Sequence, residues 1–184
     1  MEYPLMILLV PIAPTHAAAL QPLLEDPAIA ETTPFPSPYP PDGAGVWIAE
    51  AAALREEGSK YAFAVCDHGG GPIGVALLKE VDRVTGEAEL GYWIGRPYWG
   101  GGRATAAAAA TLNFAFDMLG LRAVWAVCLE ANPASLRVLA KLGFVETGRF
   151  AQALPKWPEP RPSISWRLTR EAWHSLQPGH QPDF

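Results

Sequence analysis

The sequence has little charge and no long hydrophobic run. Asp, Glu, Lys and Arg make up 18% of the 184 residues, below the roughly 25% usual for soluble domains. The net charge of −5 argues against a large basic surface for nucleic acid. The apolar stretch 5–10 ends at Pro11. It is far shorter than the roughly 20 residues of a membrane helix and lacks the basic lead-in of a signal peptide. We therefore expect no nucleic-acid partner, no membrane segment and a cytoplasmic location.

Cysteine is also scarce. Cys66 and Cys128 are the only two cysteines. They are too few to form a tetrahedral metal site by themselves, and neither belongs to a CxxC pair. We expect reduced thiols and no metal ion.

Apolar residues and proline are abundant instead. Hydrophobic residues make up 49% of the chain, which excludes a disordered protein and suits one folded domain, expected over residues 1–176. The 19 prolines are about twice the usual share of roughly 5%, and many of them gather in segments 34–41 and 155–162. Proline fixes its own φ and has no N–H, so both segments should be irregular loops. Residues 177–184 are expected to form a loose, flexible tail.

The order of the predicted elements gives the fold class. Strands are predicted from short apolar runs and helices from apolar residues at helical spacing. In chain order we expect a strand at 6–12, helices at 15–24 and 45–57, strands at 61–66, 72–80 and 87–94, a helix ending at 119, a strand at 123–129, a helix ending at 143, and strands at 144–154 and 163–168. Turn residues fill 67–71 and 82–86, which predicts an antiparallel meander. This order is typical of an α+β domain around one mixed, mostly antiparallel sheet flanked by helices.

The junction between strand 87–94 and the next helix is the most informative segment. It contains Gly100, Gly101 and Gly102 directly before the helix. Such a junction directs unpaired amide N–H groups and the positive end of the helix dipole at one spot, which suits a phosphate or pyrophosphate. The glycines remove side chains that would hold a ligand away from the backbone, and Arg103 adds a positive charge. A tight turn without a ligand is the alternative interpretation.

Two well-known phosphate loops do not match this junction. A Walker loop ends in Gly-Lys-Ser/Thr, whereas Gly102 is followed by Arg103 and Ala104. The G-x-G-x-x-G pattern would begin at Gly100 but meets Thr105 at its last glycine, and the preceding strand belongs to a meander. The sequence therefore favours neither a nucleotide triphosphate nor a dinucleotide.

Two blocks of the sequence resemble the GNAT acyltransferases. Segment 89–105 is similar to the family's fourth strand and acetyl-CoA loop, with Trp99, Gly102 and Ala104 at the first, fourth and sixth places of the pattern Gln/Arg-x-x-Gly-x-Gly/Ala. Segment 130–144, with Asn-x-x-Ser followed by Leu-Ala-Lys-Leu-Gly-Phe, is similar to the RimJ/RimL branch. That branch acetylates the N-termini of ribosomal proteins, among other amines. The resemblance covers roughly residues 6–168 and implies a sheet that splays between its fourth and fifth strands.

The resemblance implies acetyl-CoA as co-substrate, no metal, and a set of site residues. The cofactor-binding residues that it implies are Trp93, Ile94, Trp99, Gly100, Gly101, Gly102, Arg103, Ala104, Thr105, Asn132 and Lys141. The main chain of Trp93 and Ile94 would bind the pantetheine arm, and the amides of 100–105 would bind the pyrophosphate. Lys141 or Arg137 would approach the 3′-phosphate, with solvated surface charge as the alternative.

Asn132 and Ser135 would lie near the thioester, with Ser135 protonating the leaving thiolate. The structural alternatives are a helix cap at Asn132 and a small first-turn residue at Ser135.

The reaction requires a neutral amine and therefore a base. An α-amine, with a pKa of roughly 7.7–8.0, is substantially neutral near physiological pH, whereas deprotonating a lysine amine near 10.4 costs about 4–5 kcal/mol. Glu89 matches the position of the base in several GNAT enzymes, and strand alternation puts it on one face with Glu87, Gly91 and Trp93. An exposed strand glutamate is the alternative. A backbone amide of the splayed strand would stabilise the oxyanion.

The acceptor side departs from the branch. Pro162 takes roughly the place of an acidic residue that often begins the last strand, and Val10 stands where the first strand often carries an arginine. The acceptor is therefore left open as a protein N-terminus or a small-molecule amine, with Trp157 either an acceptor wall or ordinary packing. An acyl-CoA-binding module without catalysis is the alternative to an N-acetyltransferase. The alanine-rich stretch 106–110 permits close helix packing within one chain or in a homodimer.

Overall fold

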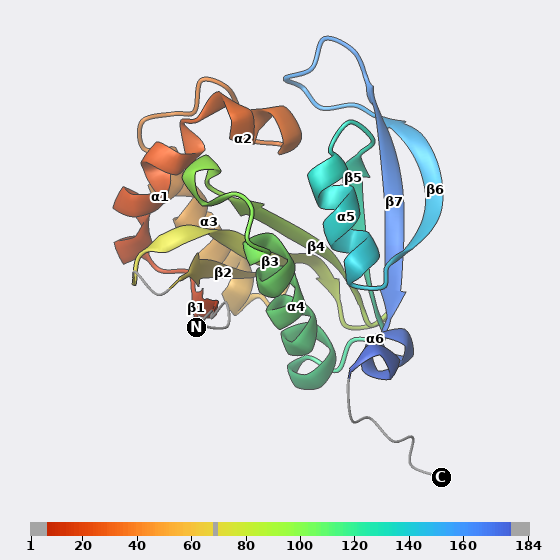
Figure 1. Ribbon diagram of the computed structural model, residues 1–184. Coiled ribbons are helices and arrows are strands. Elements are labelled where there is room, and N and C mark those ends of the chain that lie inside the picture. The colour runs from red at the N-terminus through yellow and green to blue at the C-terminus, as the bar shows by residue number, and fades with distance from the viewer. Residues whose placement is uncertain (1–6, 68–69, 178–184) are drawn as a thin grey trace.

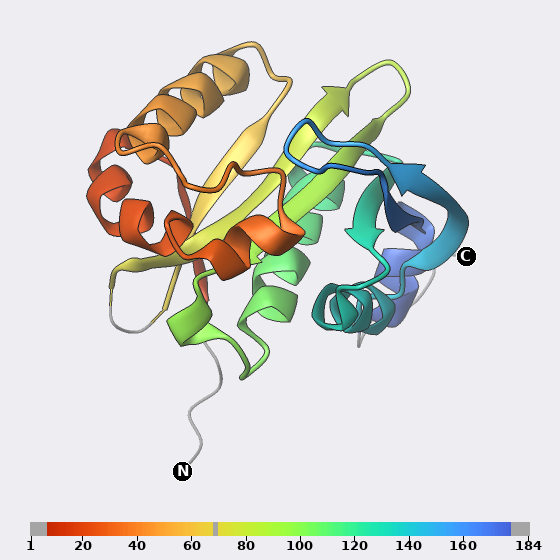
Figure 2. The same cartoon turned by 90° about the horizontal axis from the view of Figure 1, so that it is seen from above.

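The computed structural model describes residues 7–67 and 70–177 and contains one seven-stranded sheet with helices on both faces (Figures 1 and 2). The strand order is β1-β2-β3-β4-β5-β7-β6. The strands are β1 (Leu8–Pro11), β2 (Tyr61–Cys66), β3 (Pro72–Asp82), β4 (Glu87–Ile94), β5 (Ala123–Leu129), β6 (Val145–Gln152) and β7 (Arg161–Thr169). Among the described strands, only β4 and β5 pair in parallel. The predicted α+β class with a mixed, mostly antiparallel sheet is confirmed.

The helices divide between the two faces of the sheet. They are α1 (Ala17–Leu24), α2 (Pro27–Thr32), α3 (Gly43–Glu56), α4 (Arg103–Asn113), α5 (Pro133–Lys141) and α6 (Arg170–Leu176), with short 3-10 turns η1 (Pro14–His16) and η2 (Arg96–Tyr98) and a π-helical turn η3 (Phe114–Met118). One apolar core holds Leu20 of α1 and Ile48 of α3 against Trp93 of β4. A second holds Leu112 of α4 and Leu139 of α5, and a third, smaller one holds Ile94 of β4 against Ala107 of α4. Successive side chains of the sheet therefore pack on opposite faces, against separate apolar clusters.

The meander β2–β3–β4 forms as the turn residues predicted. Its second hairpin turns at residues 83–86, and the register places Lys79 directly opposite Glu89. Because side chains alternate along a strand, Glu89 and Trp93 lie on the face of α1 and α3, whereas Leu90 and Tyr92 lie on the face of α4 and α5.

The sheet splays between β4 and β5, as the family resemblance implied. Their pairing is limited to three residue pairs at the start of both strands, Glu87–Ala123, Ala88–Val124 and Glu89–Trp125. Beyond Glu89 the two strands diverge, so the rest of β4 has no strand on that edge. The divergence leaves a wedge between the half of the molecule built on β1–β4 and the half built on β5–β7.

Two short helices were missed by the sequence interpretation. In α2, Asp26 caps the helix by accepting from the Ala28 N–H at 3.0 Å, and in α6 Thr169 accepts from the Ala172 N–H at 3.2 Å. Both helices have fewer than eight residues, too few for a clear apolar period. The helix expected to run to Leu119 ends as an α-helix at Asn113 and continues as the π-helical turn.

Parts of several expected segments lie outside the described residues. These are residue 6 of the first strand, His68 and Gly69 of the turn 67–71, and all of the expected tail except Gln177. In the part of the chain that is described, no helix combines the length and the apolarity needed to cross a membrane.

The tight contact between β3 and β4 leads to a stability prediction. A Cβ at Gly74 would overlap the Trp93 carbonyl oxygen and approach Ile94 Cα to 2.9 Å, whereas a Cβ at Gly91 would meet only the Leu77 side chain, whose nearest atom, Cγ, is 3.4 Å away. We expect Gly74→Ala to lower the free energy of unfolding by about 1–3 kcal/mol because backbone must move. Urea titration with an unchanged m-value measures this loss. Gly91→Ala, in the same strand pair, is the control and should stay near the wild type; equal losses would contradict the overlap argument.

Candidate active site

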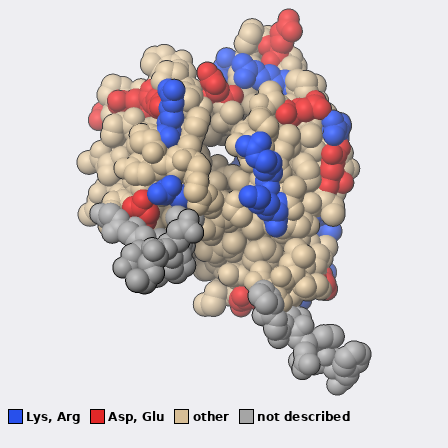
Figure 3. Space-filling model, viewed as in Figure 1, with Lys and Arg blue, Asp and Glu red and all other residues tan. Residues whose placement is uncertain are grey.

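A cavity of about 900 Å³ occupies the wedge between β4 and β5. Figure 3 shows the molecule hollowed between its two halves, with basic side chains on both rims. The cavity is lined by β4, the start of α4, β5, one side of α5 along its length and the segment after α2. Of the predicted site residues, all but Gly101 line it: Glu89, Trp93, Ile94, Trp99, Gly100, Gly102, Arg103, Ala104, Thr105, Asn132, Ser135, Arg137 and Lys141.

The start of α4 presents a row of amide groups to this cavity. Gly100, Gly101 and Gly102 have φ values of 84°, 59° and 80°, a left-handed conformation that other residues adopt at a cost. The first backbone hydrogen bond of the helix runs from the Ala106 N–H to the Gly102 carbonyl at 2.9 Å. Within the described ranges no backbone acceptor receives the amides of residues 100–105. These amides and the helix dipole therefore form an anion-binding geometry.

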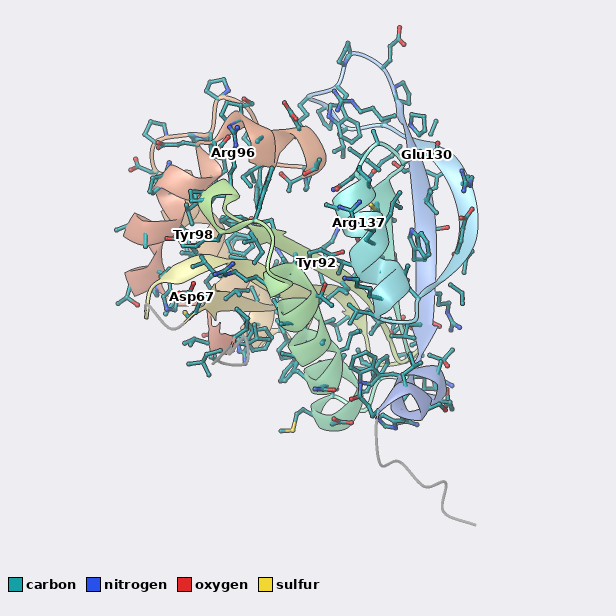
Figure 4. All side chains as sticks on the ribbon, viewed as in Figure 1. Asp67, Tyr92, Arg96, Tyr98, Glu130 and Arg137 are labelled. Atoms are coloured by element: carbon teal, nitrogen blue, oxygen red, sulfur yellow. The ribbon has the colours of Figure 1, made fainter. Side chains whose placement is uncertain are left out.

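Cations surround the same end of the cavity. Arg103, Arg137 and Lys141 line it, and Arg103 Nε lies 3.7 Å from Asp67 Oδ2. Figure 4 shows Arg137 on the side of α5 that faces the opening. Glu89 is the one carboxylate among the described residues of the lining. The electrostatic potential of the cavity thus favours a ligand with several negative charges.

The open edge of β4 supplies main-chain groups one residue away from those expected. Gly95 donates to the Ile73 carbonyl at 2.8 Å, and alternation along an antiparallel pair then directs the polar groups of Trp93 towards β3. Those of Tyr92 and Ile94 face the open edge instead. The Ile94 carbonyl already accepts from Trp99 Nε1 at 2.6 Å. Tyr92 and Ile94, rather than Trp93, therefore have main-chain N–H groups directed to the open edge.

Glu89 is a buried carboxylate with a cation beside it. It is 9% exposed, and Lys79 Nζ lies 2.8 Å from its Oε2. Burial raises the pKa of Glu89, and the hydrogen bond and charge of Lys79 oppose this rise. The alternative of an exposed strand glutamate is therefore wrong. The pairing with Lys79 was not readable from the sequence, because Asp82 pairs with Glu87 and a register shift between Lys79 and Asp82 is needed to bring Lys79 opposite Glu89.

Asn132, Ser135 and Tyr92 form a hydrogen-bonded group across the wedge. Asn132 caps α5, since its Oδ1 accepts from the Ser135 N–H at 3.1 Å. The Ser135 hydroxyl lies 2.8 Å from the Tyr92 hydroxyl, and Figure 4 shows Tyr92 extending from β4 towards α5. Burial raises the pKa of Tyr92 far above its usual range. Tyr92 thus stays protonated and can donate to Ser135 at every working pH.

Several further cavity residues were missed by sequence reasoning. Tyr92 was overlooked because it lies one residue off the Glu89 face, although alternation predicts its opposite orientation. Phe35, Trp47 and Lys60 come from loops and helices whose path to the sheet has no local signal. Trp157, considered as an acceptor wall, is not part of the lining.

The described residues contain no group of three or more His, Cys, Asp or Glu side chains placed to hold a metal ion. Cys66 and Cys128 are both buried free thiols. Cys128 lines the cavity, and burial raises its pKa.

Comparison with known proteins agrees with this geometry. A model of the acetyltransferase (GNAT) domain matches residues 6–145. YdaF of Bacillus subtilis, which carries a provisional assignment as a ribosomal N-acetyltransferase, is 31% identical over 132 residues, or 71% of this chain. The chain spans only 65% of the length of YdaF and 43% of that of p20, an uncharacterized N-acetyltransferase of Bacillus licheniformis.

Solved structures show the same fold. RimJ of Mycobacterium smegmatis, in complex with CoA-disulfide, has a TM-score of 0.83 at 24% identity, covering 90% of this chain and 82% of that one. Spermidine N-acetyltransferase of Vibrio cholerae, in complex with CoA and spermine, has a TM-score of 0.80 at 18% identity, covering 91% and 97%.

The ion pair at Glu89 gives a prediction that needs no ligand. We expect Lys79→Met to raise the pKa of Glu89 further, because the opposing charge is lost while burial remains. A carboxyl whose pKa is raised in the folded state loses stability as pH rises from its unfolded pKa through its folded one. The free energy of unfolding of the variant should therefore fall more steeply over that window than that of the wild type.

Urea titrations at a series of pH values measure this slope. Adding Glu89→Gln to Lys79→Met is the control and should remove the extra slope. An identical slope in all three proteins would show that Lys79 does not hold the charge of Glu89.

Proposed function

The chain belongs to the GNAT acetyltransferase family, and from this premise we propose that it is an N-acetyltransferase that transfers the acetyl group of acetyl-CoA to a primary amine. One observation carries the proposal: free helix-start amides and two polar side chains, Glu89 and Ser135, open into one cavity where β4 and β5 diverge. The names of the relatives support it, because the RimJ structure contains CoA-disulfide and the Vibrio enzyme contains CoA and spermine.

The residues present fit the CoA moiety. The amides of 100–105 suit its pyrophosphate, and Arg103, Arg137 and Lys141 suit its phosphate charges. The open-edge amides of Tyr92 and Ile94 suit the carbonyl groups of a pantetheine arm laid along β4. When bound, acetyl-CoA supplies the acetyl group as a thioester.

Glu89 is the proposed general base. The acceptor amine attacks as its free base, a C–N bond forms, and the amine proton passes to the Glu89 carboxylate directly or through one water. Burial favours this role, because a raised pKa makes the carboxylate a stronger proton acceptor than an exposed one. A β4 amide at the open edge stabilises the negative charge on the acetyl oxygen during attack.

Ser135 is the proposed proton donor to the leaving sulfur. As the C–S bond breaks, its hydroxyl proton moves to the sulfur, giving free CoA; Ser135 then regains a proton from water, and Glu89 releases the amine proton to water as the products leave. The Ser135 hydroxyl lies 2.8 Å from the Tyr92 hydroxyl, and either of them can donate; we take Tyr92 as the donor, which leaves the Ser135 proton for the sulfur. Asn132 supports this arrangement by capping the helix turn that carries Ser135.

The acceptor is proposed to be a protein N-terminus or a small-molecule amine. The RimJ/RimL-like motifs and the assignment of YdaF support a protein N-terminus, and the name of the Vibrio neighbour supports a small amine.

Release of CoA thiol over a panel of amines tests the activity. We expect acetyl transfer above the hydrolysis background, and Glu89→Gln should lower kcat by roughly 10²–10⁴ because the general base is lost. Calorimetry should show unchanged CoA binding by the variant. If the folded wild type binds CoA but acetylates no amine, the chain is a binding module instead.

The glycine row gives a separate prediction on affinity. Gly102→Val puts a branched side chain at a left-handed position beside the free amides, and we expect CoA affinity to fall by roughly tenfold or more. Gly120→Val imposes similar backbone strain at φ 66°, but beyond the other end of the helical segment. CoA affinities of both variants, measured by calorimetry, separate the loss of anion binding from the effect of backbone strain alone. Equal CoA affinity in Gly102→Val and the wild type would remove the anion-binding role of this turn.

A further inference from the structure

The cavity wall beneath α2 and α3 is apolar and aromatic. Phe35 lies edge-on to Trp47 and to Trp93, with ring centroids 6.3 and 6.1 Å apart. Ile29 and Leu77 complete this wall on the same face of the sheet as Glu89. The group that adjoins an amine bound at Glu89 therefore meets hydrocarbon and ring surfaces.

The charges on this face leave no partner for a second ammonium group. Glu89 is the sole carboxylate in the described lining, and it already pairs with Lys79 at 2.8 Å. Lys60 lines the same face, with its Nζ 6.0 Å from the centroid of the Trp47 ring. Its carboxylate partner Glu50, 3.2 Å away, has a side chain that is 60% exposed and lies outside the lining. A second positive charge in the cavity would thus meet Lys60.

The aromatic wall is fixed from the opposite half of the molecule. Lys156, in the β6–β7 loop, donates to the main-chain oxygens of Ala30, Thr33 and Phe35, the last at 2.6 Å. Figure 2 shows this loop and the segment after α2 meeting across the wedge. The two proline-rich segments of the sequence are therefore joined through Lys156, and Phe35 is held in place before any ligand binds.

From these contacts we propose that the acceptor is a primary amine with a single positive charge and an apolar or aromatic group beside the amine, bound against Phe35, Trp47 and Trp93. The inference rests on the proposed acetyltransfer and names the acceptor class. A free arylalkylamine and a peptide N-terminus with an apolar first residue share this chemistry.

Two pairs of amines test the class. Pentylamine and 1,5-diaminopentane differ only in the second ammonium group, and phenethylamine and ethylamine differ only in the ring. We expect kcat/KM to be about tenfold or more higher for pentylamine and for phenethylamine than for their partners. A short peptide beginning with Phe, compared with phenethylamine, separates the two sources of the amine, and a preference for either supports the class.

Variants of Phe35 and Lys60 test whether the aromatic wall and the Lys60 charge cause these two preferences. Phe35→Ala should raise KM for phenethylamine but not for acetyl-CoA, whereas Phe150→Ala, on exposed β6 outside the cavity, should change neither. Lys60→Met should narrow the preference for pentylamine over 1,5-diaminopentane, and Lys60→Arg should keep it.

The outcomes separate this inference from the proposed function. Acetylation of 1,5-diaminopentane or spermidine as efficiently as pentylamine overturns the acceptor class and leaves acetyltransfer intact. Acetylation of none of the amines or the peptide overturns both. A preference for pentylamine that survives Lys60→Met unchanged overturns the role given to Lys60.

Discussion

The short pairing between β4 and β5 is the constraint on which the rest of the structure depends. Three residue pairs hold the strands together, and the sheet continues through them as one unit. Past Glu89 the strands part, and β4 keeps hydrogen-bonding groups on its free edge. Buried main-chain groups without partners are costly, so this edge is stable only with water or a ligand beside it. The same divergence opens the sheet to ligands from both faces.

The two faces of the wedge differ in chemistry because β4 alternates its side chains. The face of α4 and α5 combines free amides with three cations, as a polyphosphate requires. The face of α1 and α3 combines aromatic rings with a single paired carboxylate. Two ligands of different charge can therefore reach the same strand from opposite sides. Such an arrangement fits direct transfer between them, with no covalent enzyme intermediate.

Local signals in the sequence were enough for the elements of the fold and for one half of the site. The meander, the glycine turn before α4 and the Asn132–Pro133 start of α5 each lie within a few neighbouring residues, so they were readable. The side of the site that faces α1 and α3 was not readable from local signals. Phe35 and Lys156 are 121 positions apart in the chain, and their contact depends on two proline-rich loops whose paths follow no period. Which main-chain groups of β4 face the open edge could not be assigned from the sequence, because the register that decides it appears only when β3 is aligned.

The hydrogen bond between Tyr92 and Ser135 has a consequence for movement of the two halves. Tyr92 follows Glu89 by three residues on one continuous strand, and Ser135 is tied to it from the other half at 2.8 Å. Because Ser135 belongs to α5, a shift of α5 away from β4 would lengthen or break this hydrogen bond. The distance between the proposed proton acceptor on β4 and the proposed proton donor on α5 therefore depends on the two halves staying together at this one contact.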